Sequence, residues 1–281
     1  MFVPDLLAGK RILVTGGGTG LGASMAQRFA GLGARLVICG RRPEPLEDTA
    51  ARLRAECGAQ VDVHRCDLRV ADEVAAMMDA IWASGPLDVL VNNAAATFIA
   101  RSEKLSARAA DAILAPTLHG ALYCTLEAGR RWIDAGRPGT VLSILSTSTI
   151  TGRAFTMPSA VAKSGVLAMT KSLAVEWGRH GIRLVAIAPG PFPTPGAAGQ
   201  LGAGKRQGRF AGDRIPLGRV GEHLELANLA SYLVSDHAGY ITGEMVAIDG
   251  GGHLRTSGAE DLLAWTDDDW DAAKPARPPR P

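Results

Sequence analysis

Glycines crowd one short segment near the start of the chain, where Thr15-Gly-Gly-Gly-Thr-Gly-Leu-Gly22 follows an apolar stretch and precedes a helical pattern. Glycine permits a tight turn and leaves room for backbone to approach a phosphate. The N-terminus of the following helix would present free N–H groups and a partial positive charge. This strand–turn–helix context predicts a pyrophosphate site, and a glycine-rich turn without a ligand is the alternative. The residues expected to line the site are Gly16, Gly18, Thr19, Gly20, Leu21 and Gly22.

Two neighbouring arginines, Arg41 and Arg42, follow the second predicted strand. In dinucleotide-binding folds, an acid about 20 residues beyond the glycines binds the ribose 2′-hydroxyl of NAD. No acid stands at the end of this strand, and guanidinium groups bind phosphate through paired hydrogen bonds. The sequence therefore predicts NADP(H), with Arg41 as the main 2′-phosphate contact and Arg42 as the second. Two solvated surface arginines are the alternative.

A serine and a lysine one helical turn apart, Ser159 and Lys163, form a second group that could do chemistry. The neighbours of Lys163 are small and apolar, which argues against the alternative of a solvated surface lysine. Ser146 ends the fifth predicted strand, where a hydroxyl bonded to backbone is an equal alternative to a catalytic one. No group of His, Cys and Asp residues has metal-ligand spacing, so we expect no metal.

Apolar strands alternate with helical patterns along the chain, which predicts an α/β fold with a parallel sheet covered by helices on both faces. We expect one doubly wound, Rossmann-type domain over residues 1–252. Predicted strands cover Arg11–Thr15, Arg35–Gly40, Val61–Cys66, Leu87–Val91, Thr140–Ser146, Ile182–Ala188 and Met245–Ile248. Predicted helices cover Leu21–Leu32, Pro45–Glu56, Asp72–Trp82 and Pro158–Trp177, with helical stretches up to about Asp134.

Composition excludes several classes of protein. The chain has 281 residues, a formal net charge of +2 and 47% hydrophobic residues, unlike a disordered chain or a strongly basic nucleic-acid binder. No apolar run is long enough to span a membrane, and the first residues lack the pattern of a signal peptide. The four cysteines show no CxxC spacing, so we expect free thiols in a reducing compartment and a cytoplasmic protein.

The glycine spacing Gly16-x-x-x-Gly20-x-Gly22 resembles that of the short-chain dehydrogenase/reductase family. Asp67 resembles the family acid that contacts adenine, and Asn92-Asn93-Ala94-Ala95 resembles its N-N-A-G turn, with Ala95 in place of glycine. The resemblance covers about residues 8–252. It implies further cofactor contacts from Asp67, Leu68, Asn93, Ala94, Ala95, Lys163, Pro189, Gly190 and Pro191.

The family's Tyr-x-x-x-Lys pair is changed here, because Ser159 stands in the tyrosine's place. In the family the lysine lowers the pKa of the phenol, which exchanges a proton with a carbonyl oxygen. An aliphatic hydroxyl is far too weak an acid for that role. Ser-x-x-x-Lys in this context resembles the 2,4-dienoyl-CoA reductase and trans-2-enoyl-CoA reductase branch. The segments Asn92-Asn-Ala-Ala-Ala-Thr-Phe-Ile99 and Lys171-Ser-Leu-Ala-Val-Glu-Trp-Gly178 also match that branch.

The branch implies an NADPH-dependent reductase of a C=C bond conjugated to an acyl thioester. Such a reduction places the hydride on carbon and charge on the thioester oxygen, which needs hydrogen-bond donors. The branch's tyrosine and asparagine donors are replaced here by Ser148 and Thr97, whose hydroxyls could donate directly or through water. By the same resemblance, Lys163 holds the nicotinamide ribose, and Ser159 supports the nicotinamide or the lysine.

Two other functions stay open at this point. One is a carbonyl reductase or alcohol dehydrogenase with a modified site, which the missing tyrosine disfavours. The other is a catalytically silent NADP-binding protein, suggested by the loss of both usual oxygen donors.

The segment Gly190–Leu217 is rich in glycine and proline, and long loops of this kind are often functional. We expect it to cover an acyl-CoA-like substrate, with an exposed basic lid as the alternative. Its cations suit the phosphates of coenzyme A, and they are Lys205, Arg206, Arg209 and Arg214. Residues 253–281 are expected to form a surface tail. Asp249-Gly-Gly-Gly252 after the last strand resembles the family's tetramer-forming edge, which implies a homotetramer.

Overall fold

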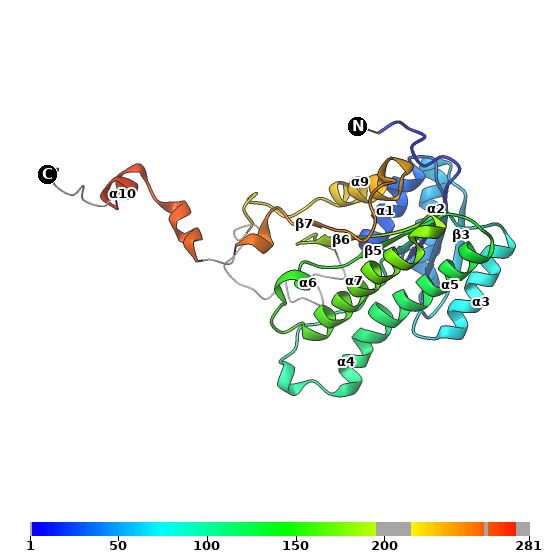
Figure 1. The fold of residues 1–281 in the computed structure, drawn as a ribbon, viewed down its shortest axis with the longest axis horizontal. Coiled ribbons are helices and arrows are strands. Elements are labelled where there is room, and N and C mark those ends of the chain that lie inside the picture. Colours follow the sequence, from blue (N-terminus) through cyan, green and yellow to red (C-terminus); the bar gives the residue numbers. More distant parts are fainter. Residues whose placement is uncertain (1, 195–214, 256–257, 274–281) are drawn as a thin grey trace.

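Seven parallel strands form one sheet in the order β3-β2-β1-β4-β5-β6-β7 (Figure 1). The computed structural model describes residues 2–194, 215–255 and 258–273. The strands are β1 (Arg11–Thr15), β2 (Arg35–Gly40), β3 (Val61–Arg65), β4 (Val89–Asn92), β5 (Gly139–Ile144), β6 (Ile182–Pro189) and β7 (Met245–Ile248). The strand order reverses between β1 and β4, the point at which open α/β sheets bind ligands. The predicted doubly wound, Rossmann-type fold is confirmed.

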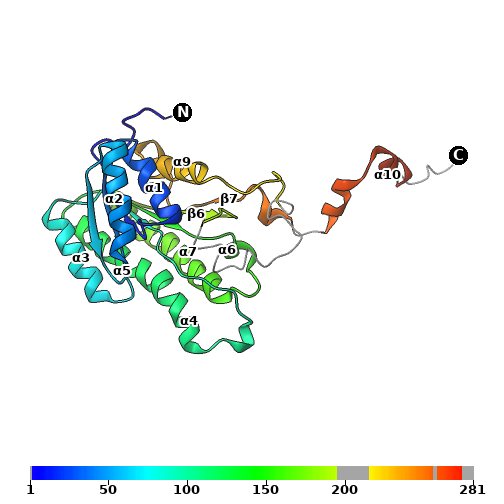
Figure 2. The same ribbon diagram turned by 180° about the vertical axis from the view of Figure 1, so that it is seen from behind.

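Helices cover both faces of the sheet, as Figures 1 and 2 show from opposite sides. The helices α1, α2 and α9 lie on one face, and α3, α5 and α7 lie on the other. The α-helices are α1 (Gly20–Ala30), α2 (Pro43–Cys57), α3 (Ala71–Ala83), α4 (Ala107–Leu114), α5 (Gly120–Asp134), α6 (Ser148–Thr151), α7 (Met157–Trp177), α9 (His223–Val234) and α10 (Asp267–Ala272). A π-helical turn, η2 (Ala115–His119), joins α4 to α5. Within the described residues, every helix is too short or too polar to span a bilayer.

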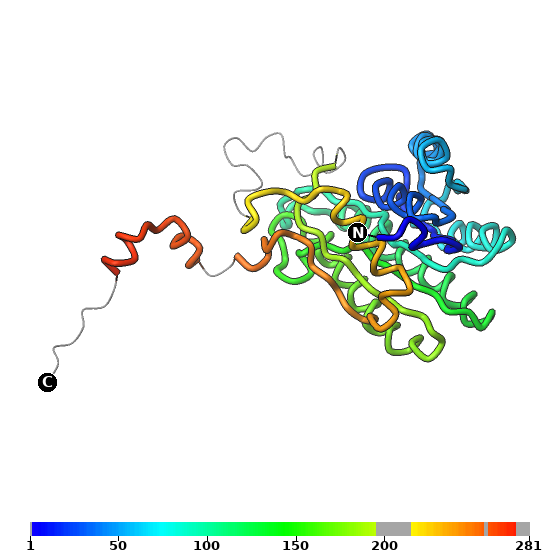
Figure 3. Tube along the Cα trace, turned by 90° about the horizontal axis from the view of Figure 1, so that it is seen from above, coloured from blue at the N-terminus to red at the C-terminus, as the bar shows by residue number. Residues whose placement is uncertain are grey.

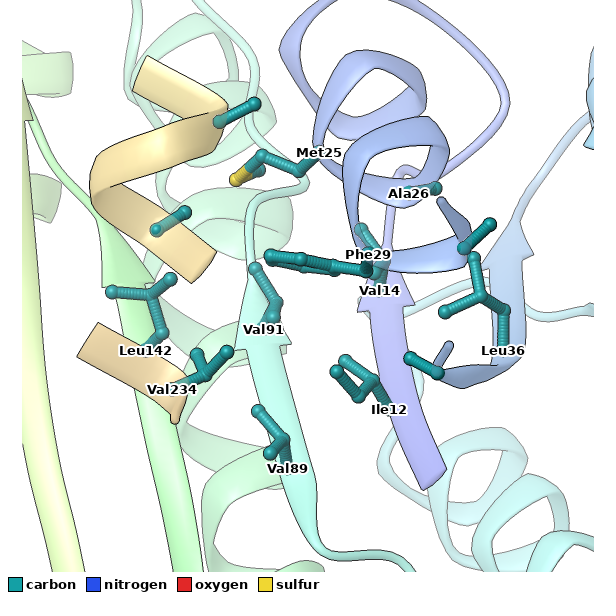
Figure 4. Close-up of a cluster of buried hydrophobic side chains, with 14 of the residues drawn as sticks. Ile12, Val14, Met25, Ala26, Phe29, Leu36, Val89, Val91, Leu142 and Val234 are labelled. Atoms are coloured by element: carbon teal, nitrogen blue, oxygen red, sulfur yellow. The ribbon is translucent and has the colours of Figure 1, made fainter. Parts of the chain in front are cut away.

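The alternation of side chains along the strands divides the core into two layers. On β1, Ile12 and Val14 pack beneath α1 with Phe29, whereas Leu13 belongs to the layer beneath α3 and α5 (Figure 4). Trp132 of α5 is fully buried in that second layer, and its indole N–H donates to the backbone oxygen of Leu87 at 2.7 Å. Burial on both faces explains why the inner strands β1 and β4 are largely apolar, whereas the edge strand β3 alternates apolar and polar residues.

The predicted elements are all present, with differences at their ends. β5 ends at Ile144, so Ser146 lies in the loop beyond the strand rather than at its last residue. α2 begins at Pro43, earlier than predicted, because proline is tolerated at the first position of a helix. The helix ends at Cys57, and the C-cap residue Gly58 has a φ of 62°, which is readily adopted only by glycine.

The described part of the predicted surface tail contains short helices and is mostly exposed. It contains short 3-10 helices over Gly252–Leu254 and Ala259–Ala264, followed by α10. Thr266 caps α10 by accepting from the backbone N–H of Asp269 at 3.3 Å. Trp265 and Trp270 pack edge to face with ring centroids 4.8 Å apart. Figure 3 shows residues 258–273 extending away from the rest of the chain.

Candidate functional site

The predicted site segments meet at the carboxyl edge of the sheet. The glycine turn follows β1, Asn93–Ala95 follow β4, Ser146 follows β5, and Gly190 follows β6. Because β1, β4, β5 and β6 are consecutive parallel neighbours, their carboxyl ends lie side by side. The fold therefore brings the expected cofactor and catalytic residues to one edge.

The glycine turn has a geometry that requires glycine. Gly16 and Gly20 have φ values of 65° and 55°, in the left-handed region. A Cβ on Gly22 would lie 2.3 Å from the backbone oxygen of Gly16, so the turn closes tightly on the start of α1. Thr19, the N-cap of α1, makes no side-chain capping bond, and the first turn holds no acid. The first N–H groups of α1 are thus uncapped by side chains, which fits a pyrophosphate.

Asn93 and Thr15 join the glycine turn to the segment after β4. The Asn93 side-chain amide donates to the backbone oxygen of Thr15 at 2.9 Å. In return, the Thr15 hydroxyl accepts from the backbone N–H groups of Asn93, at 2.9 Å, and Ala94, at 3.1 Å. Thr15 is buried, and its own hydroxyl donates to Val91. Asn93 is therefore occupied in shaping the turn.

The candidate 2′-phosphate residues lie at the end of β2. Arg41 and Arg42 are exposed and make no hydrogen bond or ion pair with any other residue that the structure describes. Asp67 follows β3 and accepts hydrogen bonds from Arg69, at 2.9 Å to Nε. That hydrogen bond, with help from the charge of Arg41, lowers the pKa of the Asp67 carboxyl. Asp67 is thus an ionised hydrogen-bond acceptor near Arg41, which follows β2.

Leu68, the residue after Asp67, packs against the start of α5. It is buried against the second core layer, and a Cβ on Gly120 would lie 2.9 Å from the Cβ of Leu68. The start of α5 therefore approaches the segment after β3 as closely as a residue without a side chain permits.

Lys163 lies on α7 and is buried rather than solvated, so the surface-lysine alternative is wrong. Its Nζ donates to the backbone oxygen of Ile144, the last residue of β5, at 2.5 Å. Burial lowers the pKa of the Lys163 ammonium to about 8. No carboxylate accepts from Nζ within the described residues, so the ammonium keeps donors for a ligand.

Four predicted hydroxyl residues come from the segments at this edge of the sheet: Thr97 follows β4, Ser146 follows β5, Ser148 begins α6, and Ser159 lies on α7. Ser146 Oγ accepts from the backbone N–H of Ser148 at 3.2 Å, so the backbone-bonded alternative holds at least in part. Ser148 is buried at the start of α6, which packs against α7. Among the described residues, the hydroxyls of Ser148, Ser159 and Thr97 have no hydrogen-bond partner. These three hydroxyls can therefore donate to an oxygen of a ligand.

Thr117 was not predicted as a site residue, yet it holds the segment that carries Thr97. It is buried in the π-helical turn, and its hydroxyl accepts from the backbone N–H of Ala96 at 3.1 Å. A further backbone bond, from Ala100 N–H to Phe155 at 3.0 Å, ties the same segment to the approach to α7. Neither contact has a sequence signal, because each joins residues from separate elements.

The segment after β6 runs back over the glycine turn. Gly190 N–H donates to Ile248 of β7 at 2.9 Å, and a Cβ on Gly190 would lie 2.4 Å from the Cβ of Asp249. Pro191 accepts from Gly221 N–H at 3.0 Å. A Cβ on Gly20 would lie 3.5 Å from the side chain of Thr194, so this segment faces the start of α1. Lys205, Arg206, Arg209 and Arg214 lie outside the described residues.

The sequence matches a family model described as "Enoyl-(Acyl carrier protein) reductase" over residues 16–253. An "Uncharacterized oxidoreductase" of Caenorhabditis elegans is 42% identical, over 95% of this chain and 88% of its own length. A "Probable 2,4-dienoyl-CoA reductase [(2E)-enoyl-CoA-producing]" of Bacillus subtilis is 40% identical, over 86% of this chain and 96% of its own length.

Solved structures of similar proteins share the fold. A short chain dehydrogenase from Bacillus anthracis has a TM-score of 0.80 and 40% identity, covering 88% of this chain and 98% of that one. A structure from Agrobacterium tumefaciens with bound NADP has a TM-score of 0.81 and 33% identity, covering 90% of this chain and 100% of that one.

Proposed function

The chain belongs to the short-chain dehydrogenase/reductase family, and from that premise we propose that it is an NADPH-dependent reductase of a C=C bond conjugated to an acyl thioester. The substrate would be a 2,4-dienoyl-CoA or a 2-enoyl-CoA. Oxidoreductase chemistry follows from the family, and the cofactor choice and the substrate are the parts proposed.

The observation that carries the proposal is the pairing of a buried Lys163 with a hydroxyl, Ser159, in place of a phenol. The chain has three tyrosines, and none stands on α7. Tyr123 packs against the second core layer, Tyr232 lies on α9, and Tyr240 is fully exposed. The tyrosine phenol that usually exchanges a proton with a carbonyl oxygen is therefore missing from α7, where Ser159 stands in its place.

Reduction of a conjugated C=C bond does not need such an acid. When bound, the nicotinamide supplies a hydride, which goes to carbon. Negative charge then builds on the thioester oxygen, and hydrogen-bond donors aimed at that oxygen lower the barrier. The unpartnered hydroxyls of Ser148 and Thr97 are the candidate donors, and the protonation of carbon is left to water or a weak acid. Loss of one such donor costs about 3 kcal/mol in well-studied sites.

Lys163 would hold the cofactor rather than the substrate. Its ammonium, fixed by Ile144, has two further N–H groups that can donate to the ribose hydroxyls. Ser159 lies one helical turn before Lys163 on α7, and it would support the nicotinamide or the lysine.

NADP(H) is favoured over NAD(H) by charge. Arg41 and Arg42 are exposed at the end of β2 without carboxylate partners among the described residues, so a 2′-phosphate would meet two available guanidinium groups. The related structure with bound NADP supports the same choice. The remaining cofactor contacts would come from Gly16, Gly18, Thr19, Gly20, Leu21, Gly22, Asp67, Leu68, Asn93, Ala94, Ala95, Pro189, Gly190 and Pro191.

Three further features belong to the proposal. The name of the Bacillus subtilis relative, a dienoyl-CoA reductase, favours an acyl-CoA substrate.

Free cysteines favour a reducing compartment such as the cytoplasm, since Cys39, Cys66 and Cys124 are buried and unpaired. In the described part of the chain, strand β7 pairs only with β6, and this open edge suits a homotetramer.

A substrate panel tests the proposal. Purified protein is mixed with NADPH and, in turn, 2,4-dienoyl-CoA, 2-enoyl-CoA and ketone substrates of several chain lengths. We expect NADPH oxidation with a thioester substrate and none with ketones. Turnover of ketones alone would indicate a carbonyl reductase, and tight NADPH binding without turnover would indicate a silent family member.

A further inference from the structure

His223, the first residue of α9, bridges two segments of the cofactor site that are far apart in sequence. Its Nδ1 lies 2.8 Å from the hydroxyl of Ser24 on α1. Its Nε2 lies 2.7 Å from the backbone oxygen of Pro193, in the segment after β6. The imidazole therefore spans from the phosphate-binding helix to the chain that lies over it.

Hydrogen-bond chemistry fixes the roles of the ring atoms. A carbonyl oxygen only accepts, so Nε2 must carry the proton that is donated to Pro193. In the neutral ring, Nδ1 is then an acceptor, and the Ser24 hydroxyl donates to it. In the charged ring, Nδ1 donates to Ser24 Oγ, whose hydrogen can turn to the Gly20 oxygen at 3.1 Å. The bond to Pro193 persists in both states.

The bridged segment faces the glycine turn. Thr194 follows Pro193 directly, and its side chain lies 3.5 Å from where a Cβ on Gly20 would stand. Gly20 is the first residue of α1, where the uncapped N–H groups fit a pyrophosphate. His223 thus binds the residue directly before the one that faces the start of α1.

The start of α9 does not need this side chain for its own stability. Glu222 and Glu225 form a capping box, in which the Glu222 N–H donates to the Glu225 carboxylate at 2.8 Å. A separate bond joins α9 to α1, from Arg28 Nε to the side-chain oxygen of Asn228 at 2.8 Å. The two hydrogen bonds of the imidazole therefore connect Pro193 to α1 and do not cap α9.

We propose that His223 is a positioning residue for the cofactor, which holds Pro193 and Thr194 over Gly20 through the relay Ser24–His223–Pro193. It would act through the backbone of that segment rather than by touching the ligand. The inference rests on the proposed function only in that it needs a nicotinamide dinucleotide to bind, and it does not depend on the acyl substrate.

The test compares NADPH binding to the apoprotein across matched variants, by fluorescence titration. His223→Ala removes both bonds and should weaken NADPH binding by about tenfold, the scale of one or two hydrogen bonds. His223→Gln carries a donor and an acceptor on one planar group and should stay within about twofold of wild type. Ser24→Ala loses only the α1 end of the relay and should fall between the two.

Asn228→Ala is the control, because it breaks the other α1–α9 bond without touching Pro193. It should lower the melting temperature about as much as His223→Ala and leave NADPH binding unchanged. Equal loss of NADPH affinity in His223→Ala and Asn228→Ala would reduce His223 to a helix-packing residue and overturn the inference. An unchanged dissociation constant in folded His223→Ala or Ser24→Ala would do the same.

The outcomes also separate this inference from the proposed function. A wild-type protein that binds NADPH and reduces no thioester leaves the His223 comparison valid while the substrate proposal fails. A wild-type protein that binds neither NADPH nor NADH would overturn both.

Discussion

The ammonium nitrogen of Lys163 donates to the main-chain oxygen of Ile144 at 2.5 Å. This bond fixes a buried cation at the end of β5, on the same edge of the sheet as the glycine turn. Because burial in a low dielectric disfavours the charged form, the pKa of Lys163 falls to about 8. The lysine is thus close to its titration range under ordinary assay conditions, which has a measurable consequence.

NADPH binding to the apoprotein should weaken as the pH rises through about 8. Below that pKa, the Lys163 ammonium carries its charge and the N–H donors assigned to the cofactor ribose, and above it the charge and one donor are lost. Lys163→Met should bind more weakly at pH 7 and show a flat profile between pH 7 and 9. Lys171→Met, an exposed lysine on the same helix, should keep the wild-type profile. NADPH titrations of the apoprotein at several pH values measure this dependence. A wild-type binding profile without an inflection near pH 8 would contradict the assignment of Lys163 to the cofactor site.

Arg41→Asp should weaken NADPH binding by about 10- to 100-fold, since it removes a charge-assisted bond and places a carboxylate against the 2′-phosphate. NADH binding should change by less than about twofold, because NADH has no 2′-phosphate. Arg35→Asp makes the same charge change at the opposite, exposed end of β2 and serves as the control. Parallel titrations with both cofactors give the answer. An equal loss of affinity for NADPH and NADH would show that Arg41 does not bind the 2′-phosphate.

Gly22→Ala should damage both folding and cofactor binding. Its new Cβ would lie 2.3 Å from the Gly16 oxygen and 2.5 Å from Asn93 Nδ2, so the turn must open. Such overpacking costs about 1–3 kcal/mol of unfolding free energy. Gly31→Ala, at the other end of α1, meets nothing closer than 3.5 Å and has an ordinary φ of −66°, so it should be neutral or slightly stabilising. Denaturant unfolding of both variants measures the difference, and similar losses would show that the turn tolerates a side chain.

Ser148→Ala should lower kcat for a thioester substrate by about 100-fold, the usual effect of removing one oxyanion donor. KM for NADPH should stay near the wild-type value, because Ser148 is assigned to the substrate oxygen. Thr151→Ala, on the same short helix α6, removes a hydroxyl that already bonds to Gly152 and provides the control. Steady-state kinetics with both substrates varied separates these effects. An unchanged kcat in Ser148→Ala would contradict the assignment of Ser148 as a hydrogen-bond donor to the thioester oxygen.

Much of the fold and the cofactor edge could be predicted from sequence, because local signals define them. Apolar strands, the glycine turn Gly16–Gly22 and the paired Arg41 and Arg42 all carry their chemistry in adjacent residues. The sequence pattern predicts a strand up to Ser146, because Leu145 is apolar like the residues before it, whereas the pairing of β5 with β6 ends at Ile144. Periodicity alone cannot locate the last ladder bond.

The contacts that shape the site could not be predicted in the same way. Thr15 binding Asn93, Lys163 binding Ile144 and Ser24 binding His223 each join segments that only tertiary packing brings together. The resemblance predicts that Asp67 contacts adenine, but it does not predict that the Asp67 carboxylate accepts a hydrogen bond from Arg69. That bond depends on the conformation of the Arg69 side chain. Such contacts follow from the topology of the sheet, which decides which strand ends become neighbours.

The most direct test of the central claim is the fate of the hydride. Protein is incubated with NADPH carrying deuterium at the transferred position of the nicotinamide and with a 2,4-dienoyl-CoA or 2-enoyl-CoA. The product is then analysed by mass spectrometry and NMR. We predict one deuterium on a carbon of the former C=C system, with the thioester intact. A parallel incubation replaces the thioester with a ketone. Deuterium on the carbinol carbon of the reduced ketone, with no label entering any thioester, would contradict the assignment.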